Sequence, residues 1–364
     1  MNVHGKPYRS LWWDESDARV RIVDQTALPH AFRVAALASL DDVCEAIRTM
    51  RVRGAPLIGV AAAYGLALAL RDDASEAAEA RAATALAATR PTAVNLRWAL
   101  RRVRDAIQGA PASERAARAL VAAAELAEEE VETSRRIGEH GLAVARERWQ
   151  AVRGRKPRLD VLTHCNAGWL ATVDFGTALS CVYRAAAEGI PLHVWVNETR
   201  PRGQGARLTA WELGEQGIAH TVIADVSAGH VLQRGLVDWC VVGSDRTTAA
   251  GDVCNKIGTY PLALAARDNG VPFHVALPVS SIDFEIHDGV AEIPIEARDP
   301  REVTHVRGRT DDGRDETVAV AAPGTEALNF AFDVTPARLV TALITERGVF
   351  PATPEGLAAI ERAR

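Results

Sequence analysis

From Leu159 to Ala276, short apolar runs alternate with stretches of helical periodicity. The apolar runs are 161–162, 192–196, 221–224, 237–242 and 273–276, and the helical stretches are 171–188, 205–216, 228–235 and 256–269. Repeated strand–helix units of this kind form a parallel sheet that is covered by helices on both faces. We therefore expect a Rossmann-like sheet. No G-x-G-x-x-G follows the first strand, so the sequence does not favour a dinucleotide site.

The first part of the chain is instead rich in alanine and in charged residues at helical spacing. Residues 73–150 are predicted to be mostly helical, and the alternating segment 19–24 predicts a strand of a small antiparallel sheet. The short basic segment 150–158 is typical of a linker. The predicted fold class is α/β. It has a mainly helical N-terminal domain with a small β-sheet at 1–150 and a Rossmann-like domain at 151–364.

Two of the helical stretches carry further expectations. The run 128–130 is three consecutive glutamates on the long helix predicted at 113–148, and we expect it to be a solvated face. The apolar stretch 57–70 is too short to span a bilayer and is interrupted by Gly59 and Gly65. We therefore expect no membrane association.

The composition narrows the class of protein. A net charge of −5 without a long basic tract argues against nucleic-acid binding. The cysteines are odd in number and form no C-x-x-C pair, which argues against a zinc site or a disulfide framework. Residues 1–6 lack the apolar core of a signal peptide, so a reducing cytoplasm fits best.

The segment 161–168 joins the first predicted strand to a sharp turn. Its first residues are apolar or β-branched, while Asn166 and Gly168 tolerate the left-handed backbone of a turn. Cys165 is thus expected at the carboxyl end of a strand and near a helix start, where ligands bind and where a thiol pKa is lowered. The alternative is a buried cysteine that only fills space.

Polar clusters follow the other predicted strands and include Gln204, Asp245, Asn255 and Lys256. Because the carboxyl ends of parallel strands meet at one crevice, these side chains should converge on Cys165. Asp245 follows an apolar strand, and such surroundings raise a carboxyl pKa towards the range of a general acid. Its alternative is an ordinary turn aspartate. Lys256 is predicted at a helix start, which disfavours a cation unless it faces an anion.

An anion site is also predicted at Arg53-Gly54-Ala55, where free amides at a helix start lie beside arginines. Arg90 adds a cation at a later turn, although both segments could be plain turns with solvated arginines. A thiol, a carboxyl and cations suit proton transfer on a phosphorylated small molecule. No histidine or carboxylate cluster has the spacing of metal ligands.

Six motifs occur together in this sequence: RGAPLIGVAAAYG at 53–65, RPTAVNLRWAL at 90–100, THCNAGWLATVDFGTAL at 163–179, ETRPRGQGARLTAWEL at 198–213, GSDRTTAAGDVCNKIGTY at 243–260 and FDVTP at 332–336. With them the chain resembles the methylthioribose-1-phosphate isomerase family, which is shared with the regulatory subunits of eukaryotic translation initiation factor 2B. The motifs span nearly the whole chain, and several long motifs in the same order are far more specific than any single one.

The resemblance implies a homodimer that needs no cofactor and converts the aldose 5-methylthioribose 1-phosphate to the ketose 5-methylthioribulose 1-phosphate in methionine salvage. The family's catalytic cysteine maps to Cys165, and its aspartate proton donor maps to Asp245. Its substrate-binding positions map to Arg53, Gly54, Ala55, Arg90, Gln204, Asn255 and Lys256. The C2 hydrogen moves to C1 either as a proton through an enediolate or as a hydride, and the sequence leaves both paths open.

Two departures from the family pattern are present. Asn197 replaces a usual aspartate and is expected to affect substrate preference, and Phe330 replaces a proline in a C-terminal turn. One alternative is an isomerase of 5-deoxyribose 1-phosphate or ribose 1,5-bisphosphate. An apolar wall, to which Trp169 is a candidate contributor, would favour a methylthio group, and a further cation would favour a second phosphate. A non-catalytic regulatory subunit is the other alternative, although it would need neither Cys165 nor Asp245.

Overall fold

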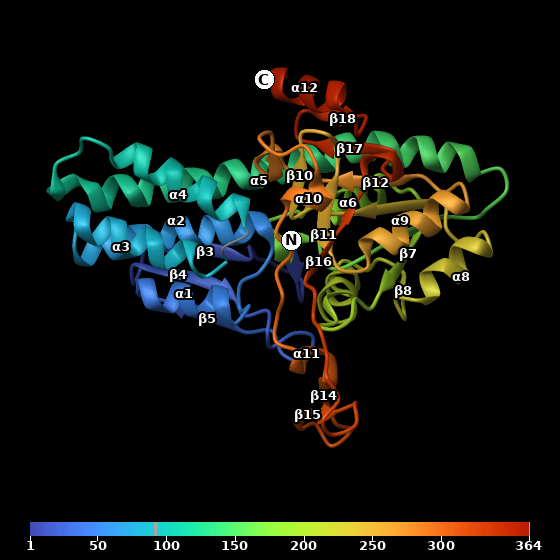
Figure 1. The fold of residues 1–364 in the computed structure, drawn as a ribbon, viewed down its shortest axis with the longest axis horizontal. Helices are drawn as coiled ribbons and strands as arrows, with labels where there is room; N and C mark the ends of the chain where they lie inside the picture. The colour runs from blue at the N-terminus through green and yellow to red at the C-terminus, as the bar shows by residue number, and fades with distance from the viewer. Residues whose placement is uncertain (91–92, 364) are drawn as a thin grey trace.

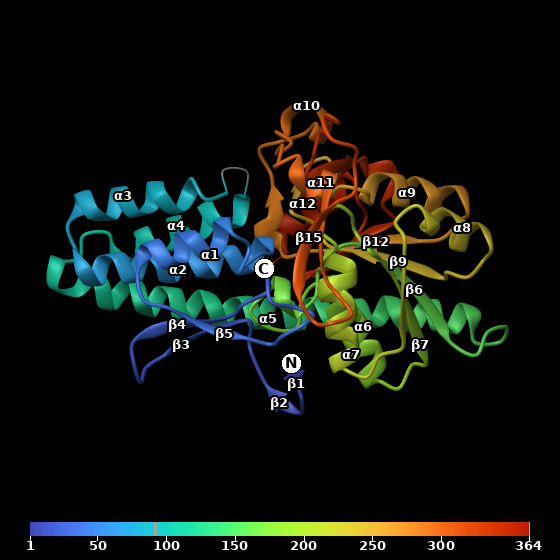
Figure 2. The same ribbon diagram turned by 90° about the horizontal axis from the view of Figure 1, so that it is seen from below.

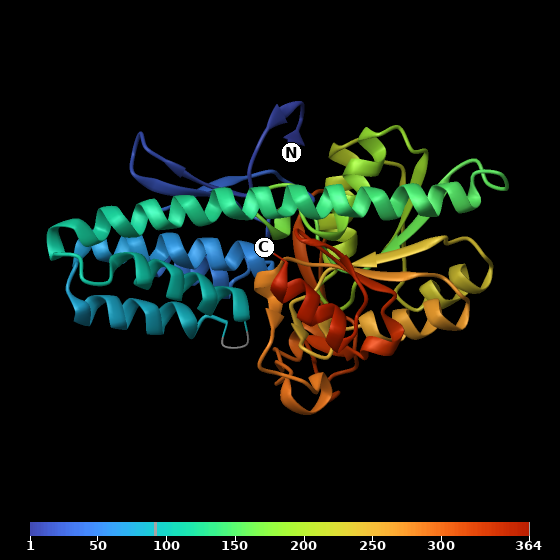
Figure 3. The same ribbon diagram turned by 90° about the horizontal axis from the view of Figure 1, so that it is seen from above.

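The computed structural model describes residues 1–90 and 93–363. The N-terminal helices and a small sheet lie on one side of the molecule, and a large sheet with its covering helices lies on the other (Figure 1). One long helix, α5 (Ala112–Val152), runs along both parts (Figure 3).

The N-terminal part confirms the predicted helices and small sheet. Strands β3 (Leu11–Asp14), β4 (Arg19–Val23) and β5 (Val34–Leu37) pair antiparallel in that order. They follow the short hairpin of β1 (Asn2–Val3) and β2 (Lys6–Pro7). The helices before α5 are α1 (Leu40–Arg48), α2 (Ala55–Asp72), α3 (Glu76–Ala87) and α4 (Val94–Ile107). The Ser39 side chain caps α1 by accepting a hydrogen bond from the Asp42 amide.

Helix α2 is longer than the apolar stretch in the sequence suggested. Among the described residues, it is the helix whose length and composition would suffice to cross a membrane, but 78% of that window is buried inside the protein. Apolar residues such as Leu57, Leu66 and Leu70 are fully buried against α4 and α5 in the N-terminal core. Its apolar character is therefore that of a core helix.

Helix α5 contributes to two hydrophobic cores. Ala119, Ala123 and Leu126 pack in the N-terminal core, while Ile137 and Ala145 pack against the large sheet. The boundary predicted at residue 150 falls within the last turn of this helix, and the two-domain division stays a proposal. Figure 2 shows the continuous helix passing from the N-terminal helices to the sheet.

The expectation of a solvated face at 128–130 is wrong for Glu130. Its carboxylate is partly buried and accepts hydrogen bonds from the Val173 amide at 2.6 Å and the Ser134 hydroxyl at 2.8 Å. Burial raises the pKa of Glu130 to about 7. The sequence could not indicate this because Val173 approaches α5 only in the folded chain.

The large sheet confirms the Rossmann-like prediction. Its strand order is β18-β17-β12-β9-β6-β7-β8, parallel except for the pair β17–β18. The strands are β6 (Leu159–Thr163), β7 (Leu192–Asn197), β8 (His220–Ile223), β9 (Trp239–Val242), β12 (Phe273–Ala276), β17 (Ala342–Thr345) and β18 (Gly348–Phe350). Its helices are α6 (Ala178–Ala187), α7 (Ala210–Glu215), α8 (Ser227–Gln233), α9 (Thr259–Asp268) and α12 (Pro354–Arg362).

Alternation along the strands assigns each helix to one face of this sheet. On β9, Trp239 and Val241 pack in the core shared with α5, α6 and α7, while Cys240 and Val242 pack in the core shared with α8, α9 and α12. Both faces are thus covered, which explains the near-continuous apolar strands.

A second, smaller sheet was not predicted. It has the order β13-β10-β11-β16, formed by β13 (Ile282–Asp283), β10 (Arg246–Thr248), β11 (Val253–Lys256) and β16 (Phe332–Thr335). A separate hairpin of β14 (His305–Arg309) and β15 (Asp315–Ala319) projects from the body of the molecule (Figure 1). The remaining short helices are α10 (Gly289–Glu292) and α11 (Arg301–Thr304).

Candidate active site

Cys165 lies two residues beyond the carboxyl end of β6, as predicted, but the predicted helix after it begins later. Residues 169–171 form a short 3-10 turn, and α6 begins only at Ala178. The Cys165 backbone has a positive φ of 63°. Its amide donates to the Thr199 hydroxyl at 2.8 Å, and its carbonyl accepts from the Thr209 hydroxyl at 2.6 Å. These two bonds hold the strained turn that presents the thiol.

The thiol faces a small cavity of about 60 Å³ between the two parts of the molecule. All nine site residues predicted from the sequence line this cavity: Arg53, Gly54, Ala55, Arg90, Cys165, Gln204, Asp245, Asn255 and Lys256. Cys165, Gln204 and Asp245 follow β6, β7 and β9, so these three converge as the strand-end argument required, whereas the two arginines come from the N-terminal part. Apolar side chains, including Met50 and Phe332, complete the wall.

One wall of the cavity is the start of α2. Gly54 caps this helix without a side chain, and its first turn carries no acidic residue, so the positive end of the helix is not neutralised there. Gly54 has a φ of +103°, and a Cβ atom on it would lie 2.3 Å from the Ala171 carbonyl oxygen. Only glycine fits this position, which brings the helix start close to the turn that follows Cys165.

The opposite wall comes from the second sheet. Asp245 directly precedes β10, and its amide donates to the Cys254 carbonyl at 3.0 Å. Asn255 and Lys256 are the last residues of β11, so the expectation that Lys256 begins a helix is wrong. The Lys256 ammonium is almost fully buried, donates to the Ala331 carbonyl at 2.7 Å and lies 4.5 Å from the centre of the Phe332 ring.

The acid–base groups of the cavity have perturbed pKa values. Burial raises the pKa of the Asp245 carboxyl, as predicted, although Lys256 and two arginines oppose the rise. Burial also raises the pKa of the Cys165 thiol, which corrects the expected helix-start lowering, and Arg53 and Lys256 only partly offset it. Burial lowers the pKa of Lys256, against the pull of Cys165 and Asp245. Lys256 therefore shifts the pKa values of Cys165 and Asp245, and both of these groups shift the pKa of Lys256.

Two polar atoms of the cavity residues are buried without a hydrogen-bond partner in the described part of the protein: Arg90 Nε and Gln204 Oε1. Arg90 forms a 3.4 Å ion pair with Glu296 through a different nitrogen. Buried polar atoms are normally satisfied, so both atoms are suited to a polar ligand in the cavity. Within the ranges 1–90 and 93–363, no group of three or more metal-ligating side chains gathers.

The sequence analysis missed a carboxylate that organises the turn after Cys165. Glu212 on α7 is fully buried, and its two oxygens accept four hydrogen bonds. The donors are Asn166 Nδ2 at 2.8 Å, the Trp169 and Leu170 amides at 2.9 and 3.1 Å, and the Tyr183 hydroxyl at 2.7 Å. Burial raises the pKa of Glu212, but four donors facing its oxygens fit the ionised carboxylate.

Asn166 extends this anchor to the N-terminal part. Its side-chain and backbone oxygens each accept a 2.7 Å hydrogen bond from the Arg53 guanidinium. Glu212 therefore orients Asn166, and Asn166 orients Arg53 towards the cavity. The only sequence signal was that Glu212 lies within a resemblance motif, because its partners are 29 to 46 positions away.

We expect Glu212→Gln to raise KM for a phosphorylated substrate and to lower the free energy of unfolding by about 1–3 kcal/mol, because the new amide would point donors at donors. Steady-state kinetics and denaturant unfolding would measure both effects. Glu215→Gln, on the same helix, is the matched control, since Glu215 contacts His4, through its amide and its imidazole, and does not line the cavity. A wild-type KM in Glu212→Gln would show that Arg53 does not depend on this anchor.

Three residues bear on the choice between the alternative substrates or depart from the family pattern, and none of them lines the cavity. Asn197 lies behind the cavity, where its amide is 3.1 Å from His164 Nδ1, while His164 Nε2 is 2.8 Å from the Ile257 carbonyl oxygen. Trp169 is fully buried in the core and does not line the cavity. Phe330 is 51% exposed, in a bridge with Ala297.

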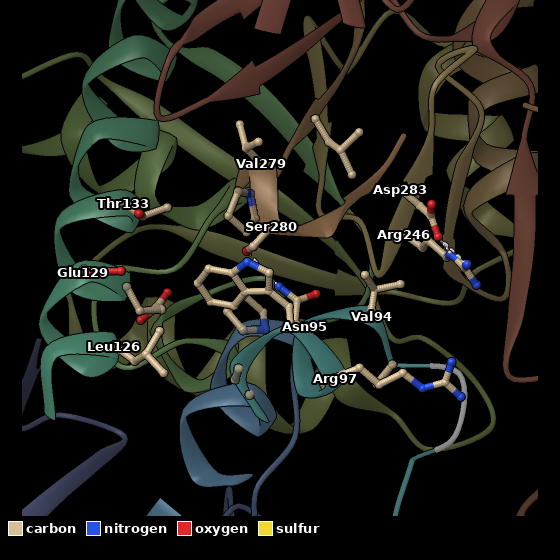
Figure 4. Close-up of a pocket in the computed structure, with 18 of the residues that line it drawn as sticks. Val94, Asn95, Arg97, Leu126, Glu129, Thr133, Arg246, Val279, Ser280 and Asp283 are labelled. Carbon is tan, nitrogen blue, oxygen red and sulfur yellow. Dashed lines mark hydrogen bonds and ion pairs between the residues drawn. The ribbon is translucent and has the colours of Figure 1, made fainter. Parts of the chain in front are cut away.

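A larger groove of about 630 Å³ lies on another side of the junction (Figure 4). Asn95 from α4 donates to the Ser280 hydroxyl at 2.9 Å across it, and Arg246 pairs with Asp283 at one end. None of the predicted site residues lines this groove.

The chain belongs to the Initiation factor 2 subunit family, whose model matches residues 51–352. Within this family it is similar to methylthioribose-1-phosphate isomerases. It is 62% identical to the one from Methylorubrum populi, over 99% of this chain and 98% of that protein. The solved structure of 5-methylthioribose 1-phosphate isomerase from Pyrococcus horikoshii is 39% identical, with a TM-score of 0.82 over 99% of this chain and 97% of the other. A structure described as translation initiation factor eIF-2B, subunit delta, from A. fulgidus is 38% identical, with a TM-score of 0.78 over 97% and 100%.

Proposed function

We propose that this protein is an aldose–ketose isomerase that converts 5-methylthioribose 1-phosphate to 5-methylthioribulose 1-phosphate in methionine salvage. The observation that supports it best is the convergence of a thiol, a carboxyl with a raised pKa and several cations on one enclosed cavity. The high identity to proteins of that name, over almost the full length of both chains, supports the same substrate.

The phosphate would lie at the start of α2, where Arg53, Arg90 and buried Lys256 supply positive charge. Phosphate on C1 blocks ring opening by loss of the anomeric hydroxyl proton. A general acid must instead protonate the ring oxygen, and Asp245 is suited to this because burial keeps its proton to higher pH. Gln204 Oε1, which has no partner among the described residues, is suited to a sugar hydroxyl.

Cys165 would handle the second proton. In the enediolate path its thiolate removes the C2 proton and returns it at C1, while the C2 hydroxyl proton passes to the Asp245 carboxylate left after ring opening. In the hydride path the thiolate takes the C2 hydroxyl proton while hydrogen passes directly from C2 to C1. The C2–H bond breaks and the C1–H bond forms in either case, with no change in net oxidation. Lys256 and Arg53 favour the thiolate electrostatically, and the enclosed cavity strengthens that effect.

Purified protein should convert 5-methylthioribose 1-phosphate to the ketose, observed by phosphorus and carbon NMR. The kcat/KM should exceed that for 5-deoxyribose 1-phosphate and for ribose 1,5-bisphosphate, because Met50 and Phe332 offer an apolar wall. With deuterium at C2, exchange into water would indicate the enediolate path, and retention at C1 the hydride path. Folded protein that is inert on the methylthio sugar but active on either relative would reject this substrate.

One observation favours a bisphosphate as a second candidate substrate. A neighbouring cavity of about 490 Å³ shares Arg53 and Gln204 with the catalytic cavity and is lined by further arginines. Inertness on all three sugars would favour a regulatory subunit instead. The homodimer, the cytoplasmic location and the lack of nucleic-acid and membrane partners stay predictions from the sequence.

A further inference from the structure

The catalytic cavity is too small to admit a sugar phosphate unaided. Its volume is about 60 Å³, whereas ligand pockets usually measure roughly 300–1,000 Å³. The neighbouring cavity of about 490 Å³ lies in that range. The two cavities share Met50, Arg53 and Gln204 as lining residues, so these side chains lie at the boundary between them.

This neighbouring cavity is strongly cationic. Of the described residues that line it, six are arginines and two are glutamates, an excess of four positive charges with His305 neutral. We call its arginines other than Arg53 the basic vestibule: Arg200, Arg202, Arg207, Arg301 and Arg307. They come from the loop after β7, the middle of the π-helical turn at Gly205–Thr209, α11 and the projecting hairpin (Figure 1).

Carboxylates neutralise this charge only in part. Arg202 pairs with Glu302 at 2.5 Å, but Glu302 is also bonded to Arg298. The Arg200 guanidinium donates to the Pro201 and Val303 carbonyls, both at 2.9 Å. Carbonyl oxygens accept hydrogen bonds from the guanidinium groups without cancelling their positive charge, so a positive potential persists in the cavity.

The positive charge of Arg207 is likewise not balanced by a carboxylate that bonds to its guanidinium. Its guanidinium donates to the Leu28 carbonyl at 3.1 Å and the Thr26 carbonyl at 3.4 Å. Burial lowers the pKa of Arg207, and the neighbouring Arg307 and Arg202 lower it further, while Asp315, which pairs with Arg307 at 3.7 Å, partly opposes them. Like charges held together in a concave site repel one another until an anion enters.

We propose that the basic vestibule is a capture site for phosphate monoesters, which concentrates the dianionic substrate at the mouth of the catalytic cavity and transfers its phosphate to Arg53. This inference rests on the proposed function for the identity of the substrate. Arg53 is suited to the transfer because it lines both cavities and is oriented by Asn166. A guanidinium binds phosphate through two parallel hydrogen bonds, so successive arginines can exchange the same group.

The test combines Arg301→Gln with Arg307→Gln and measures kinetics on 5-methylthioribose 1-phosphate over a range of salt concentrations. We expect KM to rise about tenfold at low salt and the salt dependence of kcat/KM to weaken. Arg314→Gln is the matched control, because Arg314 lies on the same hairpin, pairs with Asp312 and Glu316, and does not line the vestibule. A fall in kcat at unchanged KM would overturn the proposal.

Two further measurements separate the possible sources of the anion and the possible failures. If the double variant impairs turnover of ribose 1,5-bisphosphate alone, the vestibule holds a second phosphate, and general capture is rejected. Calorimetric titration with inorganic phosphate needs no turnover, and we expect several-fold weaker binding in the double variant. Weaker phosphate binding in a protein inert on every sugar would retain the capture site and reject the proposed function. Unchanged phosphate binding in the double variant of an active enzyme would retain the proposed function and reject the capture site.

Discussion

Asp245→Asn is expected to lower kcat on 5-methylthioribose 1-phosphate by about 10²- to 10⁴-fold, the usual contribution of a general acid. An asparagine amide has the shape of the carboxyl but cannot donate a proton to the ring oxygen. The cations around the cavity are unchanged, so KM should change much less than kcat. Initial rates of purified wild-type and variant protein would measure both constants.

The pH dependence gives this prediction a sign. Asp245 acts while protonated, and burial raises its pKa, so wild-type kcat/KM should fall as pH rises through that raised pKa. The fall in kcat/KM that is due to Asp245 should vanish in Asp245→Asn.

The free energy of unfolding should also fall as pH rises. A carboxyl whose folded pKa is raised stabilises the fold at low pH, and this stabilisation is lost as pH rises through the folded pKa.

The free energy of unfolding of the wild type should therefore fall with pH relative to that of Asp245→Asn. This comparison is also the control for misfolding, because a neutral isostere removes the cost of a buried charge. An Asp245→Asn enzyme of normal stability and near-normal kcat would assign the acid to another group.

Cys165→Ser is expected to lower kcat by a similar factor of about 10²- to 10⁴-fold, because a serine hydroxyl is far too weak an acid to supply a base near neutral pH. Arg53 and Lys256 remain in place, so substrate binding should persist and KM should change little. Cys44→Ala is the matched control, since Cys44 is buried in the N-terminal core away from the cavity. Steady-state kinetics at fixed concentrations of folded protein would compare the three proteins.

Alkylation by iodoacetamide offers a second measurement on the same thiol. Among the cysteines of the chain, Cys165 alone is partly exposed, and that exposure is to the cavity. Because burial raises its pKa, its alkylation rate should rise with pH above the range of an ordinary thiol. Substrate should protect it. Rapid alkylation at neutral pH without substrate protection would contradict both the raised pKa and the role in the cavity.

The sequence predicted the cavity residues because strand periodicity and turn residues are local properties. Cys165 and Asp245 each follow a strand of the large sheet, and parallel strands bring their ends together whatever lies between them. The family resemblance then named the substrate that Arg53, Arg90 and Gln204 are expected to bind. The roles of these residues stay proposals, whereas the fold class and the family are confirmed.

The features that sequence reasoning missed all depend on distant partners. Lys256 was expected at a helix start, but β11 is a strand because it pairs with β16, about 75 residues later. The partial burial of Glu130 and the four donors around Glu212 arise from segments that approach only on folding. The pKa of Cys165 was expected to fall because α6 was predicted to begin too early, and burial decides the direction instead.

The continuity of α5 has a mechanical consequence. An α-helix is stiff along its axis, and side chains of α5 are packed in both hydrophobic cores. A rigid-body hinge motion between the two parts would have to bend α5 or unpack one of its ends from a core. Opening of the catalytic cavity is therefore cheapest through local displacement of side chains such as Met50, which lines both this cavity and the neighbouring one. The long helix therefore joins the N-terminal core, where α2 begins, to the large sheet, and it limits how far the two walls of the cavity can separate.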